Sequence, residues 1–344
     1  MRIVTICGSV QIVTLAAHNV SQNLHLEIPF MSGTVLVRKT EFVDFEALRD
    51  AALDGPSEVV QLAQGKMSGA LMHLSVGSIG ISTGNFSHSV RGRGVLSEHR
   101  WMFTFFANPA RMQHFEVNPG NIILLAPGRE HFSSYPTANT YTSVFIEPGE
   151  LLSFIASQQG SRDAKVWREP ESLLIGAGSA SAAAAISTLV AALCDATLSD
   201  DSAEFYKRNI LQILTAPVLD GIPYRGVPLK HQSRVQLVHE VEHYLAAAGS
   251  RPIHISELSE MFRVHPRRLH RAFMDVLGVP PITFLRRKRM RDVHAVLSRG
   301  GRHVLIRAVA REHGFLELGR FAGEYQKQFG EKPSQTLKRA QLRW

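Results

Sequence analysis

The sequence predicts an α+β protein in which a β-rich N-terminal part precedes an all-α C-terminal part. Three observations predict this fold class. Short β-branched runs separated by Gly, Pro and Asn fill residues 33–147, helical periodicity replaces them from Glu150 onward, and basic residues gather near the C-terminus. The chain has 344 residues, enough for two domains. Its 44% hydrophobic and 20% charged residues are ordinary for a globular protein, so each domain has material for a core.

The net charge of +8 is distributed unevenly. Residues 231–344 hold 21 Lys and Arg against 10 Asp and Glu, whereas residues 1–230 hold 17 against 20. All the positive excess therefore lies in the last third, as expected for a domain that meets a polyanion. A solvated basic surface is the alternative that charge alone leaves open.

Residues 1–17 form an apolar stretch behind Arg2, as a weak export signal also would. Gln11 interrupts the stretch, so an N-terminal arm or early strand is the favoured interpretation. The two cysteines, Cys7 and Cys194, are too few for a disulfide framework and indicate a reducing compartment. No run reaches the roughly 18 apolar residues that a membrane span needs. We therefore expect a cytoplasmic protein without a membrane partner.

Residues 1–178 are expected to form the β-rich domain. Runs such as "ALMHLSVGSIGIST" and "RWMFTFFANP" carry β-branched and aromatic residues, with turn residues between them. Short strands at this spacing indicate an antiparallel sandwich or barrel.

Two helices and a linker are expected to follow. Residues 179–198 are alanine-rich, and residues 203–219 come after the turn-like "SDDS"; both have apolar residues at helical spacing. This pair, assigned to residues 179–222, either packs on the β-rich domain or pairs with a second copy of the chain. Residues 223–232 mix Gly, Pro and polar residues and predict a linker.

An internal repeat fills the last domain, residues 233–344. Six positions recur 52 residues further on: Leu269, Phe273, Leu277, Gly278, Pro281 and Leu285 match Phe321, Tyr325, Phe329, Gly330, Pro333 and Leu337. Each copy predicts a short helix, a tight turn, a second helix that ends at Gly, and a Pro that opens the next helix. This order is typical of a helix-turn-helix unit, whose second helix enters the major groove of DNA. The helix between the units, from Pro281 to about Ser298, would be about 27 Å long, which suits two adjacent grooves about 34 Å apart.

The first unit offers the clearest candidates for DNA contact. Arg reads guanine through two hydrogen bonds, and Arg or Lys holds phosphate. We expect base edges to be read by Arg267, His270 and Arg271. Phosphate contacts are expected from His265 and Arg268. The densest basic run, "RRKRMR" at 286–291, lies in the connecting helix and is expected to divide between phosphate and solvent or acidic partners.

The second unit resembles the signature of the AraC/XylS family of bacterial transcription regulators. The residues that carry this resemblance are Ile306, Val309-Ala310, Gly314-Phe315, Phe321, Tyr325, Phe329-Gly330 and Pro333-Ser334. Within the family, "GFLELGRFAGEYQKQFGEKPSQTL" and the terminal "RW" are most similar to regulators of ethanolamine-utilisation operons. The resemblance implies a DNA-binding regulator, more often an activator, that works with RNA polymerase. Its expected partner is double-stranded promoter DNA with two adjacent major-groove half-elements.

The second recognition helix departs from the family pattern, because Leu318, Gly319 and Gly323 stand where polar residues are common. Fewer hydrogen bonds to bases are therefore expected. Leu318 or Ala322 would touch thymine methyl groups, and Gly319 and Gly323 would permit a close approach to the DNA. Arg320 and Lys327 are expected to contact phosphate.

The resemblance also implies that the N-terminal domain binds a small effector or joins two copies of the chain, on a cupin-like barrel. "PGNIILLAPGREHF", at 119–132, is similar to a degenerate cupin strand-turn-strand that carries His131. A metal-binding cupin also needs a His-x-His pair and a Glu, so no metal ligand, cofactor or catalytic residue is predicted. The subgroup suggests an amine or a corrinoid as effector, and no effector-binding residue is assigned.

Two other functions stay open. The first is a metal-dependent cupin-type enzyme with a DNA-binding appendage, which the missing His-x-His pair disfavours. The second is an architectural DNA binder without a ligand. This function is disfavoured because the long β-rich domain would then have no function.

Overall fold

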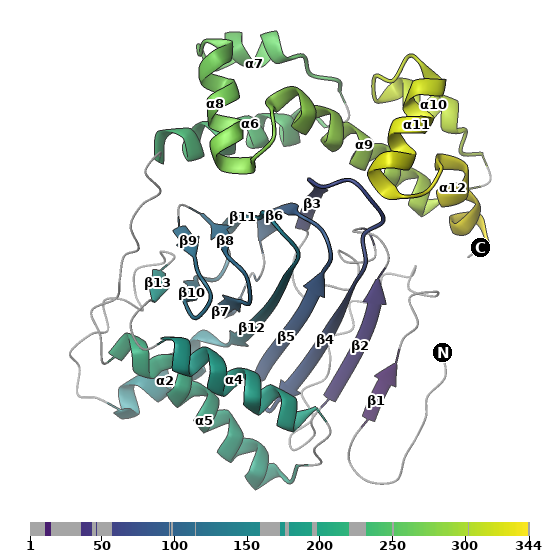
Figure 1. Ribbon diagram of the computed structural model, residues 1–344. Coiled ribbons are helices and arrows are strands. Elements are labelled where there is room, and N and C mark those ends of the chain that lie inside the picture. The colour runs from purple at the N-terminus through teal and green to yellow at the C-terminus, as the bar shows by residue number, and fades with distance from the viewer. Residues whose placement is uncertain are drawn as a thin grey trace.

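The computed structural model confirms a β-rich N-terminal region followed by an all-α C-terminal region (Figure 1). The predicted N-terminal arm, apart from one short strand, and the predicted linker, apart from Gln232, lie outside the described residues. The structure describes residues 11–14, 36–42, 46, 57–95, 97, 99–113, 115–158, 173–175, 179–194, 198–219, 232–249, 251–301 and 303–342.

The larger sheet has the strand order β1-β2-β4-β5-β12-β7-β10-β13 over the described residues. Its strands are β1 (Gln11–Thr14), β2 (Leu36–Phe42), β4 (Gly69–Val76), β5 (Ile79–Phe86), β7 (Trp101–Phe106), β10 (Ile122–Leu125), β12 (Asn139–Ile146) and β13 (Leu173–Ile175). All neighbours run antiparallel except β1 and β2, which pair in parallel. Strands β7 and β10 are buried along their whole length, because both faces of the sheet are covered.

The smaller sheet has the order β3-β6-β11-β8-β9. Its strands are β3 (Ser57–Gln61), β6 (Val90–Val95), β8 (Ala110–Met112), β9 (Phe115–Val117) and β11 (Glu130–Tyr135). Large apolar side chains, among them Met102, Phe106, Met112, Phe115 and Phe145, form one cluster contributed by both sheets. The two sheets therefore enclose a packed core.

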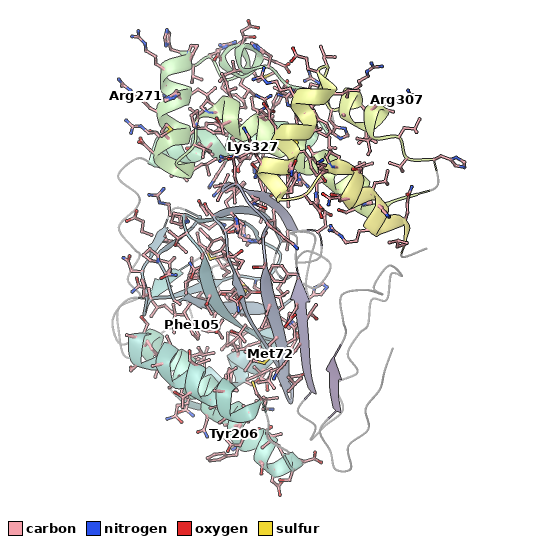
Figure 2. The ribbon with its side chains drawn as sticks, turned by 45° about the vertical axis from the view of Figure 1, so that its right-hand side comes forward. Met72, Phe105, Tyr206, Arg271, Arg307 and Lys327 are labelled. Carbon is pink, nitrogen blue, oxygen red and sulfur yellow. The ribbon has the colours of Figure 1, made fainter. Side chains whose placement is uncertain are left out.

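Helices α2 (Pro148–Gln158), α4 (Ser179–Leu193) and α5 (Asp200–Leu219) cover the outer face of the larger sheet (Figure 1). Ile186 of α4 and Leu214 of α5 belong to the same buried cluster as Phe103 of the sheet. Met72, Phe105 and Tyr206 mark this layer in Figure 2. The helical pair thus packs on the β-rich region, and its pairing with a second copy stays a prediction.

The C-terminal region contains the two predicted helix-turn-helix units. The first consists of α7 (Ile255–Met261) and α8 (Pro266–Leu277), preceded by α6 (Gln232–Ala247); the second consists of α10 (Ile306–Glu312) and α11 (Leu318–Phe329), followed by α12 (Pro333–Gln341). Helix α9 joins the units over Pro281–Arg299. Helices α8 and α11 end at Gly278 and Gly330, whose φ angles of 70° and 72° lie in the left-handed region that glycine adopts readily. The repeat read from the sequence is therefore a repeat in three dimensions.

Candidate nucleic-acid interface

Helix α8 turns its predicted base-reading side chains to solvent. On its inner side, Leu269 and Phe273 are fully buried and hold the helix against the core of the first unit. The four predicted contacts on its surface are all exposed, namely Arg267, Arg268, His270 and Arg271. The first two turns thus present three guanidinium groups and no carboxylate, a surface suited to guanine edges and phosphate. Arg271 extends outward from the helical region in Figure 2.

His265 caps the N-terminus of α8. Its Nδ1 accepts a hydrogen bond from the backbone N–H of Arg267 at 3.2 Å, and Pro266 follows as a first helical residue without an N–H. The imidazole is exposed. His265 therefore has a structural role besides the phosphate contact that the sequence predicts.

Helix α11 buries Phe321, Tyr325 and Phe329, as the four-residue spacing predicts. Its outer surface differs from that of α8. Gly319, Arg320 and Lys327 are exposed, whereas Leu318 and Ala322 are only half exposed. Leu318 packs partly against the core of the second unit, so little of it is left to face a groove. Arg320 donates to the Glu324 carboxylate at 3.0 Å, which offsets its charge.

A buried chain of polar groups fastens α11 to its neighbours. The Tyr325 hydroxyl lies 2.6 Å from Nδ1 of His294 in α9 and 2.9 Å from the Thr336 hydroxyl in α12. Thr336 donates in turn to the carboxylate of Glu331 at 2.6 Å. Hydrogen bonds satisfy these buried groups, so Tyr325 contributes more than the apolar surface expected of it.

Leu316 is an exposed residue that the sequence analysis did not single out. It lies in the turn before α11, and 81% of its surface is exposed. Its counterpart 52 residues earlier, Val264, packs partly against the core of the first unit. Comparison of the two copies position by position would have marked this pair, because both are apolar at the entrance to a recognition helix.

The basic run at 286–291 makes mainly internal contacts. Lys288 lies 3.1 Å from the Glu58 carboxylate of β3, and Arg291 pairs with the same carboxylate. Burial alone would raise the pKa of Glu58, but the charges of Arg291 and Lys288 hold it below its usual range. Arg286 pairs with Glu324, and Arg289 stacks over the Phe315 ring at 5.5 Å. These side chains therefore hold helix α9 to both regions of the protein.

The β-rich region binds both recognition helices at equivalent places. Arg111 of β8 donates to the carbonyl oxygens of Asp275 and Val276, at 2.8 and 3.0 Å, in the last turn of α8. The backbone N–H of Gly65 donates to the carbonyl oxygens of Lys327 and Gln328, at 3.1 and 3.2 Å, in the last turn of α11. The acceptors in one helix lie 52 positions after those in the other. We call these two sets of hydrogen bonds the clamp.

Further interregional contacts differ between the two units. Arg91 of β6 makes a two-bond ion pair with Glu242 of α6, at 2.6 and 2.8 Å, and both side chains are almost completely buried. Beside it the rings of Phe132 and His239 stack at 3.8 Å. The second unit is held by amide groups instead, because Gln328 donates to the Gln61 carbonyl and Gln61 donates to that of Gln328, both at 3.0 Å.

The clamp leaves the opposite ends of both recognition helices uncovered. Each helix has 12 residues, so its first residue lies about 16 Å along the axis from its last. The N-terminal turns of α8, with Arg267 and Arg268, therefore stand away from the β-rich region. The same holds for Gly319 and Arg320 in α11. Figure 1 shows α8 on the left and α11 on the right, both above the β-rich region and with α9 between the two units.

His131 lies between the two sheets. Its neighbour Phe132 faces α6, so His131 on the alternate side of the strand faces inward, as Tyr135 does. Burial lowers the pKa of His131 to about 3, which keeps the imidazole neutral at pH 7. Its Nδ1 is buried without a hydrogen-bond partner among the described residues.

Among the described residues, no three His, Cys, Asp or Glu side chains come together as a metal site would require. In the same residues no helix is long and apolar enough to cross a membrane.

The geometry defines the C-terminal region as a tandem helix-turn-helix domain, a class of domain that binds DNA. A model of helix-turn-helix domains matches residues 258–339. XylDLEGF operon transcriptional activator 2 of Pseudomonas putida is 31% identical over 136 residues, which cover 39% of this chain and 84% of that protein. XylDLEGF operon transcriptional activator 1 of the same species is 34% identical over 137 residues, 40% of this chain and 39% of that protein.

Among solved structures, a probable AraC family transcriptional regulator from Rhodopseudomonas palustris is 39% identical. The match covers 30% of this chain and 97% of that one, with a TM-score of 0.29. The chain thus covers 84% of one relative's length and 39% of another's. It belongs to the AraC/XylS family of DNA-binding transcription regulators.

Proposed function

We propose that the protein is a transcription activator that recognises a two-part DNA site and responds to a small effector. The DNA-binding part of this proposal rests on one observation. Two recognition helices of the same chain expose their N-terminal turns on the side away from the β-rich region, and α8 carries three arginines there. Arg267, His270 and Arg271 are proposed to read bases, and Arg268 and His265 to contact phosphate.

Selection of binding sites from random double-stranded DNA tests this function. The proposal expects a site with two elements about one helical turn apart. It also expects affinity to fall steeply between 50 and 200 mM salt, because Lys and Arg displace counterions from phosphate. Recovery of no enriched sequence at moderate salt would count against the proposal.

The effector is proposed to bind between the two sheets near His131. A neutral, buried imidazole whose Nδ1 has no hydrogen-bond partner among the described residues offers a hydrogen-bonding site to a polar ligand. The strands around it carry the clamp residue Arg111 and the ion-pair residue Arg91. A ligand that displaces these strands would therefore change how α8 and α6 are held.

The effector proposal is tested by thermal unfolding with a panel of amines and corrinoids. Ethanolamine and cobalamin are the first probes, because the sequence of the second unit predicts a member of the ethanolamine-operon subgroup. Stabilisation by one compound that is lost in His131→Leu supports the site. If no compound shifts the unfolding temperature of the wild type, the proposal loses its support.

Activation implies two further partners, RNA polymerase and, for a two-fold symmetric promoter, a second copy of the chain. Both are proposed here, as is action in the cytoplasm, where the DNA is. Transcription in vitro from a promoter containing the selected site, with and without the protein, tests activation. Reduced transcript in the presence of the protein would mean repression instead.

A further inference from the structure

At three positions the second recognition helix lacks the polar side chains that the first one exposes. The three base-facing candidates of α8 correspond, 52 residues further on, to Gly319, Ala322 and Gly323 of α11. None of these three can donate or accept a hydrogen bond through a side chain. Helix α11 therefore cannot distinguish bases in the way that α8 does.

An exposed apolar side chain lies just before the N-terminus of α11. Leu316 comes immediately before Glu317, the N-cap of α11. A hydrophobic residue at this position often packs against the fourth helical residue, here Phe321. Leu316 is instead 81% exposed. Removing it from water against an apolar group of a partner would be favourable.

The fold does not require the two glycines of this face. An added Cβ at Gly319 or Gly323 would meet no atom within 4 Å, and neither residue has a left-handed φ. Glycine weakens a helix relative to alanine. Two exposed glycines are therefore a cost unless another molecule approaches the backbone closely.

The surroundings of this face suit DNA as that molecule. Arg307 and Arg311 of α10, the helix before α11, are exposed, as is Arg320; Figure 2 shows Arg307 on the outer side of the second unit. Glu317 makes no side-chain cap, so the first N–H groups of α11 are not satisfied by a capping side chain. Cations and open N–H groups hold phosphate, and the only apolar group that a base pair shows in the major groove is the thymine methyl.

We propose that α11 reads thymine through methyl contacts. Leu316 packs on the C5 methyl groups of thymines in the second half-element, and Gly319 and Gly323 let the helix lie close against the adjoining bases. This inference rests on the proposed DNA-binding function and adds the base and the residues for the second half-element. It also moves the methyl contact from Leu318, which is partly buried, to Leu316.

Replacing thymine by deoxyuridine tests the proposal, because it removes the methyl group and leaves base pairing intact. The second half-element is identified as the part of the selected site whose preference survives Arg271→Ala. Each substitution at a contacted thymine should weaken binding about fourfold, the value of one buried carbon group of about 0.8 kcal/mol. Leu316→Ala should bind the two DNAs equally. The matched control is Leu342→Ala, since Leu342 is 79% exposed and lies at the end of α12.

A second variant separates folding from binding. Gly323→Ala should raise the unfolding temperature of the free protein by a few degrees, yet weaken binding to the selected site several-fold. If the protein bound DNA with thymine and DNA with deoxyuridine in the second half-element equally tightly, the inference would be overturned. The proposed function would stand as long as α8 still bound its half-element specifically. Unchanged or tighter DNA binding by Gly323→Ala would overturn the close approach. Loss of all sequence preference in the wild type would instead overturn the proposed function.

Discussion

The two helix-turn-helix units share one internal design and present different surfaces. Leu269 and Phe273 in the first unit are matched by Phe321 and Tyr325 in the second, and all four are buried. The exposed positions between them have diverged, from Arg and His in α8 to Gly and Ala in α11. A core constrains volume and polarity, whereas exposed positions are free to follow a ligand. The positions that match between the two copies therefore determine how each unit folds. The exposed positions that differ indicate which bases each unit recognises.

The attachment of the two units to the β-rich region shows the same contrast. Both recognition helices are held by their last carbonyl groups. The first unit adds a buried ion pair, Arg91–Glu242, and the second adds the reciprocal amide bonds of Gln61 and Gln328. Loss of a partner costs more for a buried charge than for a buried amide. Separating the first unit from the β-rich region should therefore cost more free energy than separating the second unit.

The largest expected effect is that of Arg91→Ala. It leaves the buried Glu242 carboxylate without its partner, which should lower the free energy of unfolding by about 3–5 kcal/mol. Urea unfolding measures the loss, and hydrogen exchange should show it in α6. The double variant Arg91→Met with Glu242→Leu removes both charges and should recover most of the stability. A loss below about 1 kcal/mol in the single variant would show that the pair does not hold the unit.

Arg271→Ala should have the next largest effect, on DNA recognition. Removing a bidentate guanidinium should cost about 1–3 kcal/mol of discrimination against the wrong base at one position of the first half-element. Competition binding with single-base variants of the selected site measures this. Arg268→Ala is the control, since a phosphate contact should weaken all sequences alike and reduce the salt slope by about one. Equal behaviour of the two variants would contradict the assignment of Arg271.

Gln328→Ala should release the second unit at a smaller cost. It removes the side-chain amide that donates to the carbonyls of Gln61 and Ala63, at about 1–3 kcal/mol, although Ala63 keeps the hydrogen bond from the Gln61 amide. Hydrogen exchange should show increased opening at the last turn of α11 and not in α6. If α6 opened to the same extent, the two units would be held as a single body.

The smallest effect is expected for Lys327→Ala. Lys327 lies in the last turn of α11, about 13 Å along the axis from Leu318, beside Gly65 of the β-rich region. Its removal should weaken binding to all sequences alike, by less than Arg320→Ala does. Salt-dependence measurements on both variants give the comparison. A larger loss at Lys327 would place the last turn of α11 against the DNA.

The succession of a β-rich region and a helical region, and the helix-turn-helix repeat, were predictable from the sequence. The spacing of apolar residues along the chain shows directly which positions are buried in a strand or a helix. The prediction for the connecting helix α9 ends one residue short of the observed helix. The exposure of Leu316 was not predictable, since an apolar residue before a helix is usually expected to pack. Nor were the contacts of Gln61 with Gln328, 267 positions away, or of Lys288 with Glu58. Such pairs depend on how two regions dock, which no local pattern encodes.

The unequal division of sequence reading between the two recognition helices is tested most directly by the selected DNA site itself. The base preferences at each position of both half-elements, measured with the wild-type protein, should show strong guanine-containing preferences in the half-element that Arg271→Ala relaxes. The other half-element should show a weaker preference, confined to thymine. Equally strong preferences in both, or a required guanine in the second half-element, would contradict the division.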